Sequence, residues 1–239
     1  MLLSYLISII VCLAGGFIGH HPAVRLDRLN KSIVLNSVLV IALLFTLLMA
    51  AYLTGLFPHA IAAPFMMSVY SFIAGFFIGY GIRLIQLRSG TGNILYIHRS
   101  FWTDHAPGFA AVIIMLYGIY RTSLLLEQPV TGIRLTSGLS LMAIGFFGLT
   151  LRIVPEFRSG GILLLDKMIA WKQVLAWNWH SEEIIRIEFL HNPEKPGEEV
   201  REILTTIPPD DRLQIETVLQ SKMDDVLEDR EKMLGFRNK

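Results

Sequence analysis

Charged residues are scarce in this sequence. They make up 17% of its 239 residues, while hydrophobic residues make up 53%; soluble domains carry about 25% charged residues. Most of the charge lies after Pro155, and the long apolar runs lie before it. This asymmetry predicts a membrane-embedded part followed by a soluble part. The formal net charge of +1 provides no general attraction to nucleic acid, which is therefore not an expected partner.

Cysteine and the common motifs of catalysis are also lacking. Cys12 is the single cysteine, so the chain cannot form an internal disulfide. The seven histidines include no HExxH pattern and no pair at helical spacing within an apolar run, and CxxC, Walker and Gly-x-Ser-x-Gly patterns do not occur. We therefore predict no catalytic, cofactor-binding or metal-binding residues, and a protein that is not an enzyme. No charge lies near the middle of an apolar run, which argues against the ion or proton relay of a secondary transporter.

What the sequence does contain is a series of long apolar runs. A bilayer core about 30 Å thick needs roughly 20 apolar residues in a helix, and five runs are of about this length: residues 2–19, 33–57, 61–82, 108–126 and 135–153. The first has no Lys or Arg before it, so we interpret it as a transmembrane helix rather than a cleaved signal peptide. The predicted fold is an α-helical transmembrane bundle of five helices over residues 1–157, followed by a small α+β domain over residues 158–239.

Basic residues in the short loops predict the orientation of the chain. Loops on the cytosolic side are richer in Lys and Arg, and the first and third loops contain Arg25, Arg28 and Lys31, and Arg83, Arg88 and Arg99. The N-terminus is therefore expected outside and the C-terminal domain in the cytosol, so that the chain would be a multi-pass protein of the cell membrane. Arg25 and Arg28 are also candidates for contact with lipid headgroups or a partner, although an ordinary positive-inside loop gives the same pattern.

Small residues mark one face of the third apolar run. Ser71, Gly75 and Gly79 follow one another at four-residue spacing, which lets two helix backbones approach closely. The pattern predicts a helix-packing seam. The partner helix is either in the same chain or in a second copy, so a homodimer remains one interpretation.

Two stretches of the sequence resemble each other. Residues 75–102 and 145–171 each begin with Gly-Phe-Phe, continue through Arg-Ser-Gly and a short apolar run, and end at a tryptophan, Trp102 or Trp171. We interpret each as a helix that leaves the membrane at an arginine and turns on Ser-Gly into a strand. Either this is an internal repeat or the ends of membrane helices have similar compositions by chance.

The tail has the pattern of a small sheet with one helix. Short apolar runs at 161–167, 169–177, 184–191 and 200–207 are typical of strands, and residues 192–199 are expected to form a loop. Pro208-Pro209 ends the last strand, and a helix is expected from about Arg212, capped by Asp210 or Asp211. Its apolar stripe is predicted to consist of Leu213, Ile215, Val218 and Leu219. The tail is thus predicted to be an antiparallel sheet closed by one helix.

The tail resembles a group of uncharacterised bacterial membrane proteins that have a small pleckstrin-homology-like domain. The resemblance covers residues 159–222 and rests on Gly161-Ile162, Ile169-Ala170-Trp171, Val174, Trp177, Trp179 and Ile207-Pro208. It implies the fold of the tail and its cytosolic side, and it brings no catalytic residues. A weaker resemblance, to bacterial membrane proteins associated with cytochrome c biogenesis, rests on the run from Asn93 to Phe101, Asn-Ile-Leu-Tyr-Ile-His-Arg-Ser-Phe.

Tryptophans are the most unusual feature of the tail. On an unbroken strand Trp171, Trp177 and Trp179 would share one face, and with Trp102 they would contact the membrane surface or a partner; alternatively they form an aromatic core. We expect Trp171 in the core and Trp177 or Trp179 partly exposed. These observations favour a non-enzymatic membrane protein whose cytosolic tail docks a protein partner or the membrane surface. The alternative is a subunit or accessory factor of an assembly pathway, such as cytochrome maturation, or a transporter component.

Overall fold

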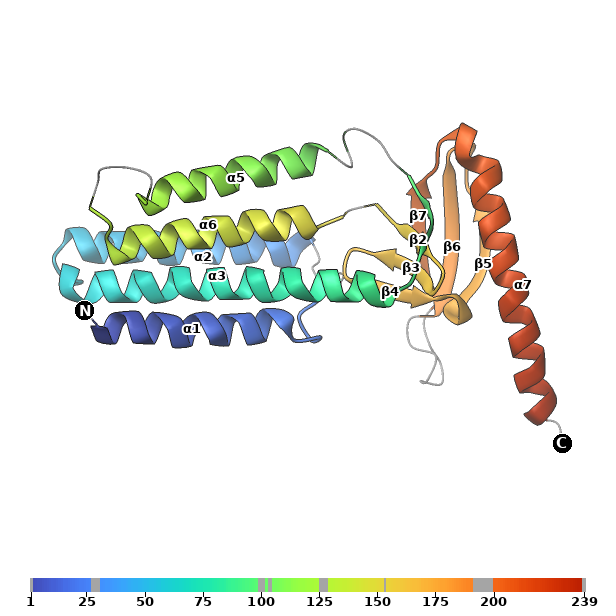
Figure 1. Ribbon diagram of the computed structural model, residues 1–239, viewed down its shortest axis with the longest axis horizontal. Coiled ribbons are helices and arrows are strands. Elements are labelled where there is room, and N and C mark those ends of the chain that lie inside the picture. Colours follow the sequence, from blue (N-terminus) through green and yellow to red (C-terminus); the bar gives the residue numbers. More distant parts are fainter. Residues whose placement is uncertain are drawn as a thin grey trace. The chain divides into compact units, whose positions relative to one another are not determined.

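The computed structural model divides the chain into two compact units (Figure 1). It describes residues 2–26, 31–98, 102, 105–124, 129–152, 154–190 and 200–237. The first unit comprises Met1–Gln86 and Asp104–Leu151, and the second comprises Leu87–Thr103 and Arg152–Lys239. The segment 87–103, which the sequence analysis placed between two membrane helices, thus belongs with the tail. The expected domain boundary after residue 157 runs through a strand of the second unit, Glu156–Arg158.

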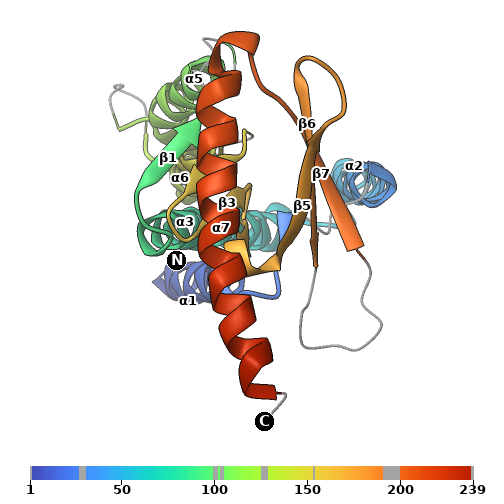
Figure 2. The same ribbon diagram turned by 90° about the vertical axis from the view of Figure 1, so that its right-hand side faces the viewer.

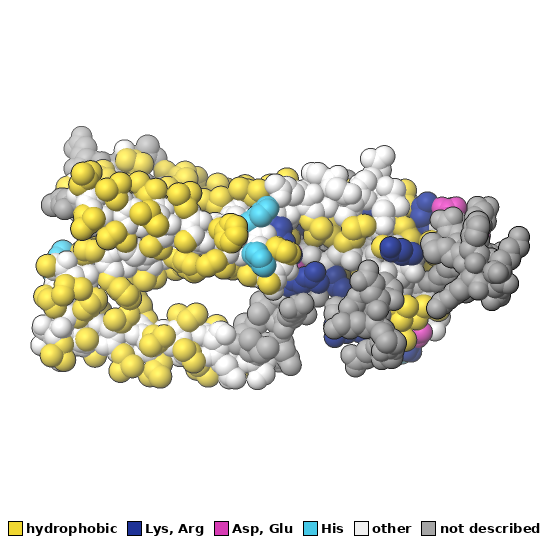
Figure 3. All heavy atoms as spheres, turned by 90° about the horizontal axis from the view of Figure 1, so that it is seen from below, with side chains coloured by type: hydrophobic (Ala, Val, Ile, Leu, Met, Phe, Trp, Pro, Cys, Tyr) yellow, Lys and Arg dark blue, Asp and Glu magenta, His cyan; other side chains and the backbone are white. Residues whose placement is uncertain are grey.

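The first unit consists of long apolar helices. They are α1 (Leu2–His20), α2 (Lys31–Leu53), α3 (His59–Gly90), α5 (Ala106–Thr122) and α6 (Gly132–Thr150). Among the described residues, α1, α3, α6 and the Leu35–Leu53 part of α2 are long and apolar enough to cross a membrane, while α5 is shorter, at 17 residues. Hydrophobic side chains cover the face of these helices seen in Figure 3. Such a surface suits a bilayer, because exposed apolar area of this extent is rare on soluble monomers.

Helices α1 and α3 pack through the predicted glycine seam. A Cβ atom at Gly75 would overlap the carbonyl oxygen of Cys12, and one at Gly79 would overlap that of Gly16. Ser71 is buried on the same helix. The seam therefore contacts a helix of the same chain, and only glycine permits this approach.

Helices α5 and α6 also pack through close contacts. Gly118 of α5 lies against Gly138 of α6, and a Cβ atom at either position would come within 2.8 Å of the other's carbonyl oxygen. The ring of Phe147 on α6 packs edge-on to Tyr80 on α3, with 5.4 Å between ring centroids. By contrast, none of the apolar window of α2 is buried within the chain.

In the part of the second unit that the structure describes, the strands form two antiparallel sheets. The four-stranded sheet has the order β1 (Ile94–Ile97), β2 (Glu156–Arg158), β3 (Gly161–Leu164) and β4 (Lys167–Ala170), and the three-stranded sheet has the order β5 (Val174–Trp179), β6 (Ile184–Leu190) and β7 (Val200–Thr206). Helix α7 (Arg212–Arg237) lies in front of the sheets in Figure 2, with β1 and β3 seen on one side of it and β5, β6 and β7 on the other. Its Ile215 and Leu219 are fully buried in the shared core. The sheet and the closing helix predicted for the tail are thus present.

Two of the predicted strands are wrong in detail. The run 161–167 is split by a turn at Leu165, whose φ is +55°, and the run 169–177 is broken by a 3₁₀ turn, Trp171–Gln173. The side-chain oxygen of Gln173 accepts a hydrogen bond from the Ala170 amide at 2.9 Å, which stabilises the corner. As a result β4 and β5 belong to different sheets. The predicted loop 192–199 lies outside the described residues.

The two similar stretches have different backbone structures. Arg88, Ser89 and Gly90 form the last turn of α3, whereas Arg158 ends β2 and Ser159-Gly160 form a turn. The two stretches are therefore similar in sequence at Arg-Ser-Gly but differ there in secondary structure.

Candidate functional site

Trp171 and Trp102 have opposite environments. Trp171 is 5% exposed, and its indole N–H donates to the Arg158 carbonyl at 2.9 Å. This confirms that Trp171 is a core residue. Trp102 is 75% exposed. Because the chain turns a corner at Trp171–Gln173, the expectation that Trp171, Trp177 and Trp179 share one unbroken strand is wrong.

Trp177 and Trp179 lie on the inner face of β5, at the edge of the core. They are opposite Ile187 and Ile185 of β6, both of which are fully buried. Both indole rings are half-buried and pack against the core. The partial exposure predicted for these two residues is therefore present, on the side of the sheet that α7 covers.

Trp179 is held by two residues of α7. Its indole N–H donates to the Glu216 carboxylate at 2.7 Å, and the guanidinium of Arg212 lies 4.6 Å from the ring centroid. Arg212 also donates to Glu216 at 3.1 Å. The hydrogen bonds from Arg212 and then from Trp179 hold the pKa of the Glu216 carboxyl below its usual value. Glu216 is thus kept ionised, and Trp179 fixes the position of α7 on the sheet.

Trp177 instead lines an open groove between β5 and α7. The groove has a volume of about 660 Å³ and is lined by Trp177, Leu213, Glu216, Thr217, Gln220, Ser221, Asp224 and Asp225. Leu213, which was predicted to be buried, is 77% exposed at its rim. The groove therefore combines an aromatic ring and an aliphatic side chain with polar side chains of α7, a composition typical of a surface that binds another chain.

The lining of this groove is acidic. Among the described residues that line it are three carboxylates, Glu216, Asp224 and Asp225, and no Lys or Arg. Lys222 forms an ion pair with Asp225 at 2.7 Å, and Gln220 donates to Asp224 at 3.1 Å. With Arg212 paired to Glu216 at 3.1 Å, two cations beside the groove face three carboxylates, which leaves one negative charge in excess.

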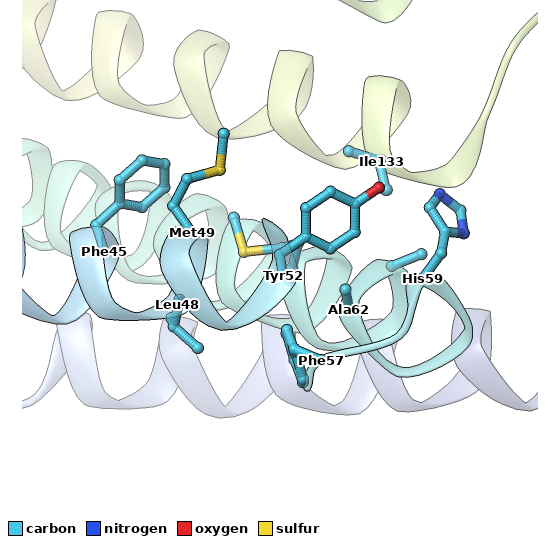
Figure 4. A pocket seen from close by; sticks show the side chains of 10 residues that line it. Phe45, Leu48, Met49, Tyr52, Phe57, His59, Ala62 and Ile133 are labelled. Carbon is cyan, nitrogen blue, oxygen red and sulfur yellow. The ribbon is translucent and has the colours of Figure 1, made fainter. Parts of the chain in front are cut away.

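The first unit contains a different cavity, which is almost entirely apolar. It has a volume of about 230 Å³ and is lined by side chains of α2, α3 and α6 and of the connection between α2 and α3. Figure 4 shows Phe45, Met49 and Tyr52 on α2, across from His59 and Ala62. Among the described residues of its lining, only Tyr52 and His59 offer polar side-chain atoms, and they form no constellation for catalysis.

A buried carboxylate in the second unit was not predicted from the sequence. Glu156 on β2 is 1% exposed and forms ion pairs with Arg158 at 2.6 Å, Arg88 at 3.5 Å and Arg152 at 3.6 Å. The guanidinium of Arg158 also donates to the carbonyls of Arg88 and Gly92 at 2.8 and 2.9 Å. This cluster, Glu156 with Arg88, Arg152 and Arg158, connects the end of α3 to the start of the tail. The arginines were visible in the sequence, but nothing there indicated that they meet at one carboxylate.

The basic loop after α1 is only partly described. Arg25 is half-buried and its Nε donates to the Pro22 carbonyl at 3.2 Å, while Arg28 lies outside the described residues. Arg83 of α3 donates to the carbonyls of His21 and Val24 and so holds this loop to α3. No metal-ligand group of three or more His, Cys, Asp or Glu side chains occurs in the described ranges.

Comparisons with known proteins assign no family. No family model, curated protein or solved structure matches the chain.

Proposed function

We propose that this chain is an integral protein of a bacterial inner membrane whose cytosolic C-terminal domain docks a partner protein through the groove between Trp177 and α7. The observation that carries the proposal is the composition of this groove. It brings a half-buried tryptophan and an exposed leucine beside three carboxylates. No catalytic constellation among the described residues competes with a binding role.

The helices of the first unit support a membrane location. Over the residues that the structure describes, four of them are long and apolar enough to cross a bilayer. The basic first and third loops favour an N-terminus outside and the tail in the cytosol. In that orientation the groove would be available to cytosolic proteins and to the cytosolic domains of other membrane proteins.

The charge of the groove favours a protein over the membrane surface. The cytosolic leaflet is negatively charged, and it would be repelled by the excess negative charge of the groove. A protein segment that carries Lys or Arg beside an apolar residue would be attracted by the carboxylates and could pack on Trp177 and Leu213. We therefore assign the groove to a basic amphipathic segment of a partner.

The strand arrangement supports the family resemblance as a proposal for the fold of the tail. A four-stranded and a three-stranded sheet share one core that α7 closes, and a pleckstrin-homology-like domain is our assignment for it. An accessory factor of an assembly pathway, such as cytochrome maturation, would need the same kind of docking surface. Identification of the partner would thus also test that alternative.

Photo-crosslinking in the full-length protein tests the docking surface. A benzophenone amino acid at Thr217, an exposed position of α7 in the groove, should crosslink to a defined protein in cells. The crosslinked peptide of that protein should be rich in Lys or Arg. Asp224→Lys should abolish the product, because it reverses one charge of the groove.

Two controls separate this surface from the rest of the domain. The same photoreactive residue at Asn178, on the outer face of β5 where it pairs with Arg186, should give no such product. Glu202→Lys makes the same change in charge on that outer face and should leave crosslinking at Thr217 intact. Crosslinking to lipid alone, or to an acidic peptide, would show that the groove does not bind a basic protein segment.

A further inference from the structure

The apolar cavity of the first unit has a size and a lining that suit a flat ring. Its volume is about 230 Å³, and an apolar cavity of about 150 Å³ is already large enough to bind benzene. Its lining includes three aromatic rings and two thioethers, those of Phe45, Tyr52, Phe57, Met49 and Met66. Aromatic and methionine side chains pack favourably on aromatic ligands. The cavity thus accommodates one substituted ring, but not a whole phospholipid, because even drug-sized ligands occupy roughly 300–1,000 Å³.

The cavity opens along α2. On this helix Phe45, Met49 and Tyr52 are 58%, 50% and 41% exposed, whereas Ala62 on the α3 wall is buried. The apolar part of α2 is long enough to cross a membrane, and none of it is buried within the chain. In a bilayer the opening would therefore face lipid, and a ligand dissolved in the membrane would enter it laterally.

Two polar side chains lie at one end of the cavity. Tyr52 precedes the last residue of α2, Leu53, and His59 is the first residue of α3. In Figure 4 the Tyr52 hydroxyl points toward the end of the cavity where His59 and Ile133 lie. No hydrogen bond to another described residue engages the Tyr52 hydroxyl or the His59 imidazole. Each can therefore donate a hydrogen bond to an acceptor on a bound ligand.

The chemistry of the lining selects among the ligands that a membrane supplies. The described residues of the lining include no Lys or Arg, so the cavity has no cation that would attract a phosphate. An acyl chain has no acceptor for the two donors. A quinone combines a flat ring, carbonyl oxygens that accept hydrogen bonds and an apolar tail. The ends of membrane-spanning helices lie near the membrane–water interface, where a ring with both apolar and polar parts is favourable.

We propose that this cavity binds the ring of a membrane-dissolved isoprenoid quinone. Tyr52 and His59 donate to its carbonyl oxygens, and its tail lies along α2 in the lipid. The sequence analysis predicted no such site, because Tyr52 and His59 belong to different helices and form no recognised motif. The proposal shares the membrane location of the first unit with the proposed function, but not the groove at Trp177. Quinone binding and partner crosslinking can therefore fail independently.

Binding of radiolabelled decylubiquinone to the full-length protein in phosphatidylcholine nanodiscs tests the site. After subtraction of empty nanodiscs, the wild-type protein should show saturable binding. Tyr52→Phe, which removes only the hydroxyl, should weaken binding roughly five-fold, which corresponds to about 1 kcal/mol for one hydrogen bond. His59→Leu should weaken it by a similar factor. Absence of saturable binding to the wild type would overturn the proposal, as would unchanged affinity in both variants.

A matched control is available on α5. Tyr117 is 56% exposed and is not among the described residues that line the cavity, so Tyr117→Phe makes the same change elsewhere in the first unit and should leave the affinity unchanged. Decylbenzene, which has the same tail on a ring without carbonyl groups, should compete only weakly with decylubiquinone. Equally strong competition by decylbenzene would overturn the quinone and assign the cavity to the apolar chain of a lipid.

Discussion

At the scale of single residues, Glu156 is a buried acid that pairs with three arginines of the second unit. Removal of one partner from a buried ion pair typically costs about 3–5 kcal/mol, because it leaves the other charge uncompensated. Glu156→Gln would leave three guanidiniums without their acid, two of them no more than 16% exposed. We expect this variant to lower the free energy of unfolding by about that amount. Thermal unfolding followed by tryptophan fluorescence reports it, since Trp171 bonds to the Arg158 carbonyl.

The control is an acid of the same type in an exposed pair. Glu188 is 31% exposed and pairs with Arg186 at 3.1 Å, and such pairs contribute only about 0–1 kcal/mol. Glu188→Gln should therefore melt close to the wild-type temperature. Equal destabilisation by the two variants would mean that the Glu156 cluster is not a special support of the fold.

The environment of Tyr96 predicts how the stability of the second unit changes at alkaline pH. Its side chain is 4% exposed and its hydroxyl donates to the Asp211 carboxylate at 2.9 Å. Burial, followed by this hydrogen bond and the charge of Asp211, raises the pKa of Tyr96 well above its ordinary value. The unfolded chain, whose tyrosine ionises near pH 10, then loses its proton first, so the contribution of Tyr96 to stability is complete below about pH 10 and is lost above it.

Tyr96→Phe should remove this dependence. The variant is expected to be less stable than the wild type near neutral pH, because Asp211 loses its donor, and the difference should shrink as the pH rises above about 10. Thermal melts over that pH range give the slope of stability against pH for the wild type and for the variant. Parallel slopes would show that Tyr96 does not titrate differently in the folded state.

Residue roles were only partly visible in the sequence. Trp171 was correctly placed in the core, because it lies in an apolar run of a small domain. The burial of Glu156 had no local signal, since its three arginines come from positions 88, 152 and 158 and meet only in the folded chain. Leu213 fitted a helical stripe and yet is exposed, because the residues of α7 that enter the core are Ile215 and Leu219.

At the scale of elements, hydrophobicity located the helices but did not define the sheets. Long apolar runs have one compatible structure in a membrane, so each predicted run corresponds to a helix. The corner at Trp171–Gln173 contains neither Gly nor Pro and gave no signal for a turn. The pairing of β1 with β2 joins residues more than 55 positions apart, and composition carries no information on such a contact.

The glycine seam between α1 and α3 gives the prediction for this scale. Gly75→Leu should separate the two helices, because its side chain would overlap the Cys12 backbone, and overpacking of this kind costs about 1–3 kcal/mol. We expect a lower melting temperature and faster labelling of Cys12, the single cysteine, by a membrane-permeant maleimide.

Gly90 provides the matched control on the same helix. A Cβ atom there would have no heavy atom within 4 Å, so Gly90→Leu should change neither the melting temperature nor the labelling rate. If Gly75→Leu behaved like Gly90→Leu, the close approach of α1 to α3 would not be needed for stability.

At the scale of the whole molecule, the topology depends on whether α5 crosses the membrane. Its 17 residues make a helix about 26 Å long, shorter than a bilayer core of about 30 Å. However, α5 packs antiparallel to α6, with Gly118 against Gly138 at one end and Ala111 against Gly145 and Gly148 at the other. A helix in contact with α6 over this length would cross the membrane whenever α6 does. On this ground we propose five spans, which would put the two termini on opposite sides of the membrane.

Reporter fusions would test this topology in cells. Fusions after Phe57 and Gln128 should report the non-cytosolic side, and fusions after Arg28, Arg99 and Lys239 should report the cytosol, because the loops rich in Arg and Lys stay inside. If α5 does not cross, the chain has four spans, and the position after Gln128 and the C-terminus both exchange sides. A cytosolic signal after Gln128 together with an external signal after Lys239 would therefore contradict five spans. It would also place the Trp177 groove outside the cell, where the cytosolic partner that we propose could not reach it.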